Sequence, residues 1–158
     1  MSPTSRPSLP TVVRRADADA ATARTLLVKS HPARVFARPV FARLRRICLA
    51  LPDAVEGWSW NHPVFRVGTK SFCAFEVVKG RPSVAFRVMV AGARQFARKQ
   101  HFFATPFGRG VWFSRWVDVA VDPESLGPHI AISYRLVAPK RLLRDLAETS
   151  ARRRPARH

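Results

Sequence analysis

"PVFRVGTKSFCAFEVVKGRPSVAFRVM", residues 63–89, contains three runs of strand-forming residues separated by two short turn signals. Alternation with a period of two predicts three strands, "VFRVG", "SFCAFEVV" and "SVAFRVM". Phe65 and Val67 are expected on one face of the first strand, and Arg66 and Arg87 on mixed, half-polar faces. The stretch therefore predicts an antiparallel meander with one packed face and one half-exposed face.

Two more strands are expected outside this meander. "AVEGWSW", residues 54–60, precedes it through a turn at Asn61-His62-Pro63, and "VWFSRWVDVAV", residues 111–121, is the last strand. Both faces of the last strand are apolar, so at least one of Trp112 and Trp116 is expected to be buried against a helix. In the middle strand of the meander, the same alternation places Phe72, Ala74 and Val78 on one face.

Helices are predicted on both sides of the strand region. In residues 39–52, an apolar stripe recurs at helical spacing, Pro39 suits the first turn and Pro52 ends the helix. A short basic helix is expected over 91–100, before an aromatic loop over 101–110. Asp122 is the expected N-cap of a later helix, which Pro139 divides from a shorter one. This order predicts an α+β fold: helix, four strands, helix, strand, helix, with an antiparallel sheet of about five strands and helices packed on one face.

The composition along the chain predicts one domain between two basic tails. Residues 1–37 are rich in Ser, Thr, Pro, Ala and Arg without a sustained period, which predicts a disordered leader. The α+β domain is expected over 38–149, and residues 150–158 form a basic tail.

The charge is strongly unbalanced, with 28 Lys and Arg against ten Asp and Glu and a net charge of +18. The first 38 residues hold seven basic and two acidic side chains and the last nine hold four basic ones, which leaves +9 for residues 39–149. A GC-rich genome would explain why arginine replaces lysine, but it does not explain the scarcity of acids. The balance favours a polyanionic partner, nucleic acid first and an anionic membrane surface second.

Signals for an enzyme are weak. The chain has no G-x-S-x-G, no glycine-rich phosphate loop and no H-E-x-x-H, and its five histidines lack metal-ligand spacing. His62 is interpreted as a turn residue, and Cys48 and Cys73 as reduced core residues. No apolar run is long enough for a membrane span, and the N-terminus lacks a compact apolar segment. We therefore expect a cytoplasmic, non-enzymatic protein without cofactor or metal.

Basic residues interleaved with aromatic residues are the stronger functional signal. Cationic side chains neutralise phosphates, and exposed indoles stack on bases. Six basic residues on the strands or in their turns are expected on one surface: Arg66, Lys70, Arg81, Arg87, Arg109 and Arg115. If they lie on opposite faces of the fold, this single-surface hypothesis fails.

Four segments, in order, resemble the MmcQ/YjbR family of small bacterial proteins proposed to bind DNA: "RLRRICLALPDAVEG", "PVFRVGTKSFCAF", "ATPFGRGVW" and "ISYRLVAPKRL". The resemblance implies a CyaY-like fold and a double-wing mode in which sheet edges and hairpins contact DNA. It also implies that Lys70, Arg109, Arg135 and Lys140 match recurrent basic sites and that Trp112 matches the family tryptophan. A frataxin-like iron role on the same fold would need an acidic first helix, whereas this one carries Arg43, Arg45 and Arg46.

We expect a small monomeric protein that binds DNA, as a duplex and with weak sequence preference, mainly through phosphates. The predicted nucleic-acid-binding residues are Arg66, Lys70, Arg81, Arg87, Arg109, Trp112, Arg115, Arg135 and Lys140. The alternative is an adaptor or regulatory domain that binds a protein or a small anionic ligand in a pocket between sheet and helix, lined by Trp58, Trp60 and Arg115. An enzyme whose site forms only in the folded chain is a third alternative.

Overall fold

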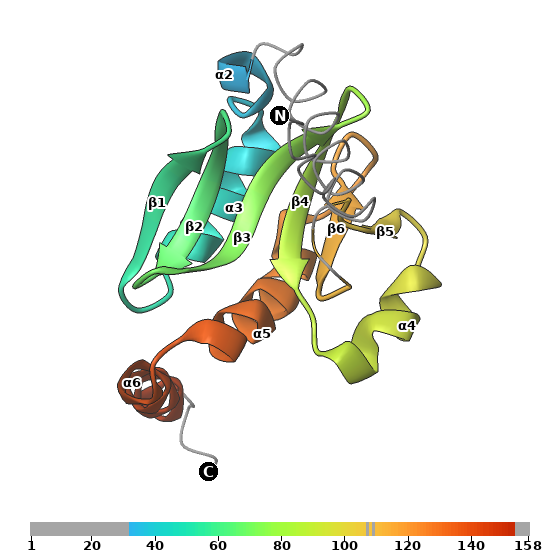
Figure 1. Cartoon of the computed structure of the whole chain (residues 1–158). Coiled ribbons are helices and arrows are strands. Elements are labelled where there is room, and N and C mark those ends of the chain that lie inside the picture. Colours follow the sequence, from blue (N-terminus) through green and yellow to red (C-terminus); the bar gives the residue numbers. More distant parts are fainter. Residues whose placement is uncertain (1–31, 107, 109, 154–158) are drawn as a thin grey trace, which may run out of the picture.

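The computed structural model describes residues 32–106, 108 and 110–153, which form a six-stranded antiparallel sheet with helices packed on it (Figure 1). The strand order is β1-β2-β3-β4-β6-β5. The strands are β1 (Ala54–Ser59), β2 (His62–Val67), β3 (Lys70–Val78), β4 (Arg81–Arg87), β5 (Phe102–Ala104) and β6 (Trp112–Trp116). The helices are α2 (Pro32–Val35), α3 (Pro39–Leu49), α4 (Ala93–Ala97), α5 (Gly127–Val137) and α6 (Lys140–Arg152), with 3-10 turns η1 (Val90–Gly92) and η2 (Pro123–Leu126).

The predicted α+β class and the antiparallel meander are confirmed, with one strand more than expected. The additional strand, β5, lies in the segment that was predicted to be a loop, and it pairs with β6 through only three residue pairs. Three residues are too few for alternation to be recognised in a sequence. The helix expected over 91–100 is also shorter, because η1 and α4 together cover Val90–Ala97.

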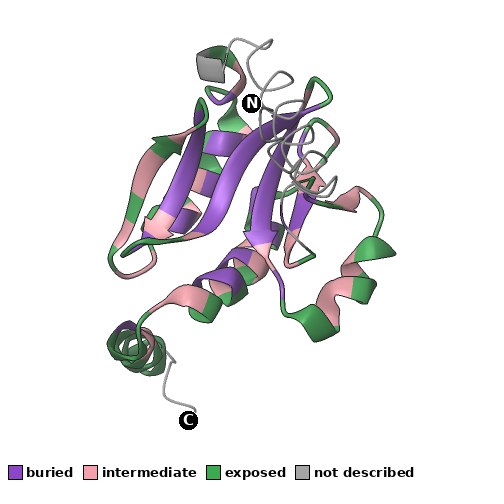
Figure 2. Ribbon diagram, in the orientation of Figure 1, coloured by how far each residue is buried: buried purple, intermediate pink, exposed green. Residues whose placement is uncertain are grey.

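One face of the sheet, the helix face, packs against α3 and α5. Phe41 of α3 lies with its ring centroid 4.7 Å from that of Phe75 in β3, in a core that also contains Ile130 of α5. Figure 2 shows that β2, β3 and β4 are buried along most of their length, whereas α6 is largely exposed. The other face, the open face, carries the small cluster Val64, Ala74 and Ala85.

A β-bulge in β3 determines which side chains reach the open face. Phe65 pairs with Cys73 but Arg66 pairs with Ser71, so β3 contains one additional residue, Phe72. The Phe72 ring lies 5.4 Å from that of Tyr134 in α5, and Phe72 and Cys73 both belong to the core of the helix face. The prediction that Phe72 shares a face with Ala74 and Val78 is therefore wrong, because the bulge shifts the alternation by one residue.

Ser133 of α5 bridges the sheet beside this bulge. Its buried Oγ accepts a hydrogen bond from the Arg87 backbone N–H at 2.8 Å and donates one to the Phe72 carbonyl at 2.5 Å. We expect Ser133→Ala to lower the free energy of unfolding by about 2–3 kcal/mol, because it leaves a buried donor and a buried acceptor unpaired.

Ser83→Ala is the matched control for this change. The Ser83 Oγ is fully buried but has no hydrogen-bond partner within the described part of the chain. Its removal is expected to be neutral or stabilising. Urea denaturation of both variants tests the difference, and equal losses would contradict the assigned role of Ser133.

The ends of several elements agree with their sequence signals, and one turn differs. The Asp122 side chain accepts a hydrogen bond from the Glu124 N–H at 3.2 Å, and Pro139 separates α5 from α6, as predicted. The turn before β2 is formed by Trp60 and Asn61, both with positive φ, so the expected turn at 61–63 lies one residue too late. His62 consequently begins β2.

The folded part begins before residue 38. The Phe36 side chain is only 4% exposed, and its ring centroid lies 5.2 Å from that of Phe41. At the other end, α6 continues to Arg152. Residues 1–31 of the leader predicted over 1–37 and the last five residues of the predicted tail lie outside the described residues. Within the part that is described, no helix combines the length and apolar character needed to cross a membrane.

Candidate functional site

Four open-face residues form a row across the sheet. Arg66 of β2 pairs with Ser71 of β3, and the Arg87 Nε of β4 donates a hydrogen bond to the Ser71 carbonyl at 3.0 Å. Arg87 in turn pairs with Trp112 of β6, and its guanidinium carbon lies 5.0 Å from the centre of the indole ring. Arg66, Ser71, Arg87 and Trp112 are hereafter called the basic row. The exposed Lys70 precedes Ser71 in β3 and adds a further cation at its edge.

Within the described residues, no acid forms an ion pair with the cations of the basic row. The ion pairs found in the described residues join Arg43 to Asp122 and Glu124, Arg45 to Glu56, Arg81 to Asp118 and Arg141 to Asp53. None of these pairs includes Arg66, Lys70 or Arg87. Their charge is therefore available to an anionic partner.

Arg81 lies on the open face but at the opposite end of β4 from Arg87. It makes two hydrogen bonds with Asp118, at 2.6 and 2.9 Å, and its guanidinium stacks over Trp116 at 4.2 Å. The Arg81 guanidinium lowers the pKa of the Asp118 carboxyl, so the pair is ionised at neutral pH. Arg81 thus has an internal anionic partner, unlike the basic row.

The remaining predicted basic residues lie elsewhere. Arg115 aligns with Val84 on the helix face, with its guanidinium 5.5 Å from the centre of the Phe102 ring, and partial burial lowers its pKa. Arg135 and Lys140 are exposed on α5 and α6, and Arg109 is outside the described residues. The hypothesis of one surface for all six strand and turn cations does not hold. Of the six, Arg66 and Arg87 remain together on the open face, whereas the exposed Lys70, at the start of β3 beside them, pairs with Val67 of the helix-face core.

Both tryptophans of β6 lie on the open face. Trp112 packs against the Val64, Ala74 and Ala85 cluster, and Trp116 stacks on Phe103 with ring centroids 4.1 Å apart. The expectation that one of them is buried against a helix is wrong, since the helix-face positions of β6 are held by Phe113 and Arg115.

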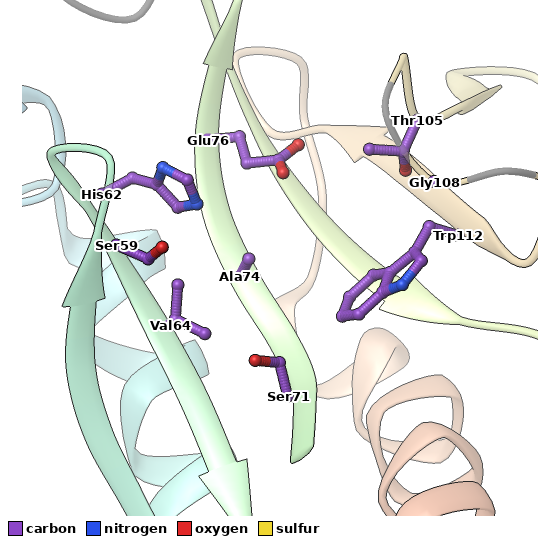
Figure 3. Close-up of a pocket in the computed structure, with 9 residues that line it drawn as sticks. All are labelled: Ser59, His62, Val64, Ser71, Ala74, Glu76, Thr105, Gly108 and Trp112. Carbon is purple, nitrogen blue, oxygen red and sulfur yellow. The ribbon is translucent and has the colours of Figure 1, made fainter. Parts of the chain in front are cut away.

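A hollow of about 180 Å³ lies beside the basic row on the open face (Figure 3). Val64 and Ala74 lie between its polar walls, and Trp112 closes one side. Its lining residues are Ser59, His62, Val64, Ser71, Ala74, Glu76, Thr105, Gly108 and Trp112. Two of them, Ser71 and Trp112, also belong to the basic row, so the hollow and the row are contiguous.

Glu76 is the most unusual side chain of the hollow. It is 4% exposed, and its Oε2 has no hydrogen-bond partner within the described residues. Burial raises the pKa of the Glu76 carboxyl to about 8, and a hydrogen bond with Ser114 acts in the opposite direction. The carboxyl is therefore protonated and neutral at pH 7, when it offers both a donor and an acceptor.

His62 and the hydroxyl groups of Ser59, Ser71 and Thr105 complete the polar lining. His62 is buried, burial lowers its pKa, and its Nδ1 has no partner in the part of the chain described. The Thr105 Oγ1 lies 2.8 Å from the Ser114 Oγ. A Cβ added at Gly108 would stand 2.2 Å from the Trp112 Cβ, so this close approach of loop and indole requires glycine.

Sequence reasoning did not find Glu76 or this hollow. The available signal was one carboxylate inside the apolar run "FCAFEVV", where a charge is costly to bury. The pocket that was expected, between sheet and helix, does not form from the predicted residues. Trp58 in β1 and Arg115 in β6 are separated by three strands in the sheet.

The described residues contain no cluster of three or more His, Cys, Asp or Glu side chains able to hold a metal ion. Burial raises the pKa of Glu76 and lowers that of His62, so it favours the neutral form of both side chains at pH 7. The chemistry of the hollow is that of neutral hydrogen bonding beside a cationic rim.

Comparisons with known proteins agree with this architecture. The sequence model of the YjbR family matches residues 49–136, more than half of the chain. Among solved structures, the crystal structure of the Deinococcus radiodurans protein DR2400, which carries a DUF419 domain, is similar at 22% identity with a TM-score of 0.52. That similarity covers 61% of this chain and 77% of the other and shows a shared fold. No curated protein matches the chain.

Proposed function

The chain belongs to the YjbR family, and on that premise we propose that it is a small DNA-binding protein that contacts mainly phosphates through its open sheet face. The observation that carries the proposal is the basic row. Arg66 and Arg87 flank Ser71 on three neighbouring strands, with Lys70 next to them and no acid of the described residues paired to them. No helix of the described residues covers this face, which leaves it accessible to a long, rod-like polyanion.

Weak sequence preference follows from the type of contact that the face offers. Guanidinium and ammonium groups bind phosphates without reading the base sequence. α3 and α5, the two helices packed on the sheet, have their apolar sides in the core and are not positioned as recognition helices on the open face. We propose a monomeric, non-enzymatic protein of the cytoplasm that binds duplex DNA with little discrimination.

Salt dependence tests this proposal directly. Fluorescence anisotropy of labelled duplex DNA is measured with the full chain at several salt concentrations. We expect log K to fall linearly with log salt by about 0.9 for each phosphate neutralised. The Lys70→Ala variant should reduce this slope by about 1, because it removes one exposed cation.

Polyglutamate of matched length is the control for charge alone. An affinity for DNA that does not depend on salt, or equal affinity for polyglutamate, would contradict phosphate recognition by this face.

The adaptor alternative is less well supported. An anionic ligand in the hollow would lie beside the buried Glu76 carboxyl. No Arg or Lys is among the described residues that line the hollow, so no cation there would compensate the charge of the ligand. Anion binding is therefore favoured at the rim, at Arg66 and Arg87, and this location agrees with phosphate contacts.

A further inference from the structure

Two buried polar atoms of the hollow have no partner within the described residues, the Glu76 Oε2 and the His62 Nδ1. Figure 3 shows the Glu76 carboxyl and the His62 ring, from neighbouring strands, at the border of the same space. A buried polar group without a hydrogen bond is unfavourable, and native proteins leave few of them. The lack of a partner for these two atoms is explained if a ligand supplies their hydrogen bonds.

The size and walls of the hollow restrict that ligand. About 180 Å³ is less than the roughly 300 Å³ at which pockets for drug-sized ligands begin, so a single flat ring system fits and a whole cofactor does not. Val64 and Ala74 provide an apolar floor, and the Trp112 indole provides an aromatic wall. The ligand must therefore have apolar faces and a polar edge.

The position of the hollow indicates what is attached to the ring. It is contiguous with the basic row, where Arg66 and Arg87 lie on the strands to either side of Ser71. We propose that the hollow receives one unpaired nucleobase of a nucleic-acid strand whose backbone phosphates are held by Arg66, Arg87 and Lys70. This inference rests on the proposed function and adds a ligand for the hollow.

A nucleobase matches each of these features. Its faces are apolar and stack on aromatic side chains, and its edge carries hydrogen-bond donors and acceptors. The Glu76 Oε2 and the His62 Nδ1 bind that edge, and Trp112 contacts the face of the ring. The Ser59 and Ser71 hydroxyls lie within the same lining and provide further donors and acceptors.

The test compares DNA backbones of equal charge. A fully abasic single strand is measured against strands of the same length that carry one central base, with the four bases tested in turn. For the full-length protein, we expect at least one base to strengthen binding by about 10-fold, the effect typical of one stacked base. Glu76→Leu should abolish this gain without changing affinity for the abasic strand.

Ser83→Ala is the matched control, because it removes a buried, unpartnered polar atom that does not line the hollow. It should keep the 10-fold gain. Equal binding of the wild type to all strands overturns the nucleobase site and leaves phosphate binding intact. Salt-dependent binding of duplex DNA without binding of the abasic strand overturns the nucleobase site alone, whereas loss of salt-dependent binding to both overturns the proposed function itself. A free deoxynucleoside monophosphate that binds as tightly as the strand overturns the assignment to a strand.

Discussion

Glu76→Gln is expected to stabilise the fold at pH 9 by up to about 5 kcal/mol, at about 1.4 kcal/mol per pKa unit, and to have little effect at pH 4. The reason is the burial of the carboxyl, which raises its pKa from 4.5 in the unfolded chain to about 8. Between these pH values the folded state retains a proton that the unfolded state has lost. The free energy of unfolding of the wild type therefore falls as pH rises through this window and levels off above pH 8.

Urea denaturation of wild type and Glu76→Gln at pH 5 and pH 9 measures this effect. The difference between the two proteins isolates the contribution of Glu76 to the free energy of unfolding. Glu56→Gln is the control, because Glu56 is half-buried and accepts two hydrogen bonds from the Arg45 Nε, at 2.8 and 3.0 Å. That change should destabilise the protein. An equal difference at both pH values would show that Glu76 is ionised throughout.

Replacing Arg66 and Arg87 together by glutamine is expected to weaken duplex binding by about 100-fold at low salt, at roughly 1.4 kcal/mol for each lost contact. Each arginine loses a charge-assisted hydrogen bond to phosphate, and the salt slope should decrease by about 2. Anisotropy titrations at several salt concentrations measure both quantities. Circular dichroism checks that the fold is intact, because Arg87 also contacts Trp112 and Ser71.

Arg135→Gln with Lys140→Gln is the matched control for this pair. It removes the same charge from the exposed surface of the helix layer. We expect a loss of affinity below about 3-fold, because solvent-exposed charges are screened beyond about 8–10 Å. Equal losses in the two double variants would place the DNA-binding surface elsewhere than on the open face.

Local sequence signals were sufficient for most of the fold. The stripe of α3, the Asp122 cap and the turn at Lys79-Gly80 depend on neighbouring residues, and the structure contains each of them. β5 was missed because it is too short to show a period and exists only by pairing with β6.

The faces of β3 could not be predicted in the same way. The bulge at Phe72 is compatible with the sequence, but its position follows from the fit of Phe72 against Tyr134 and from the Ser133 bridge in α5. These contacts join residues about 60 positions apart. The candidate site could not be predicted from the sequence for the same reason. The bulge is what places both Ser71 and Glu76 on the open face with Arg66. Composition predicted the basic character of the site, whereas its location required the register of the strands.

The measurement that tests the central claim most directly is a titration of the isotope-labelled full chain with duplex DNA, followed by backbone and indole NMR shifts. We predict that the largest shifts occur at Arg66, Ser71, Arg87 and the Trp112 indole N–H on the open face, and at Lys70 beside them. Shifts confined to α5 and α6, or to residues 1–31 and 154–158, would contradict the assignment of DNA binding to this face.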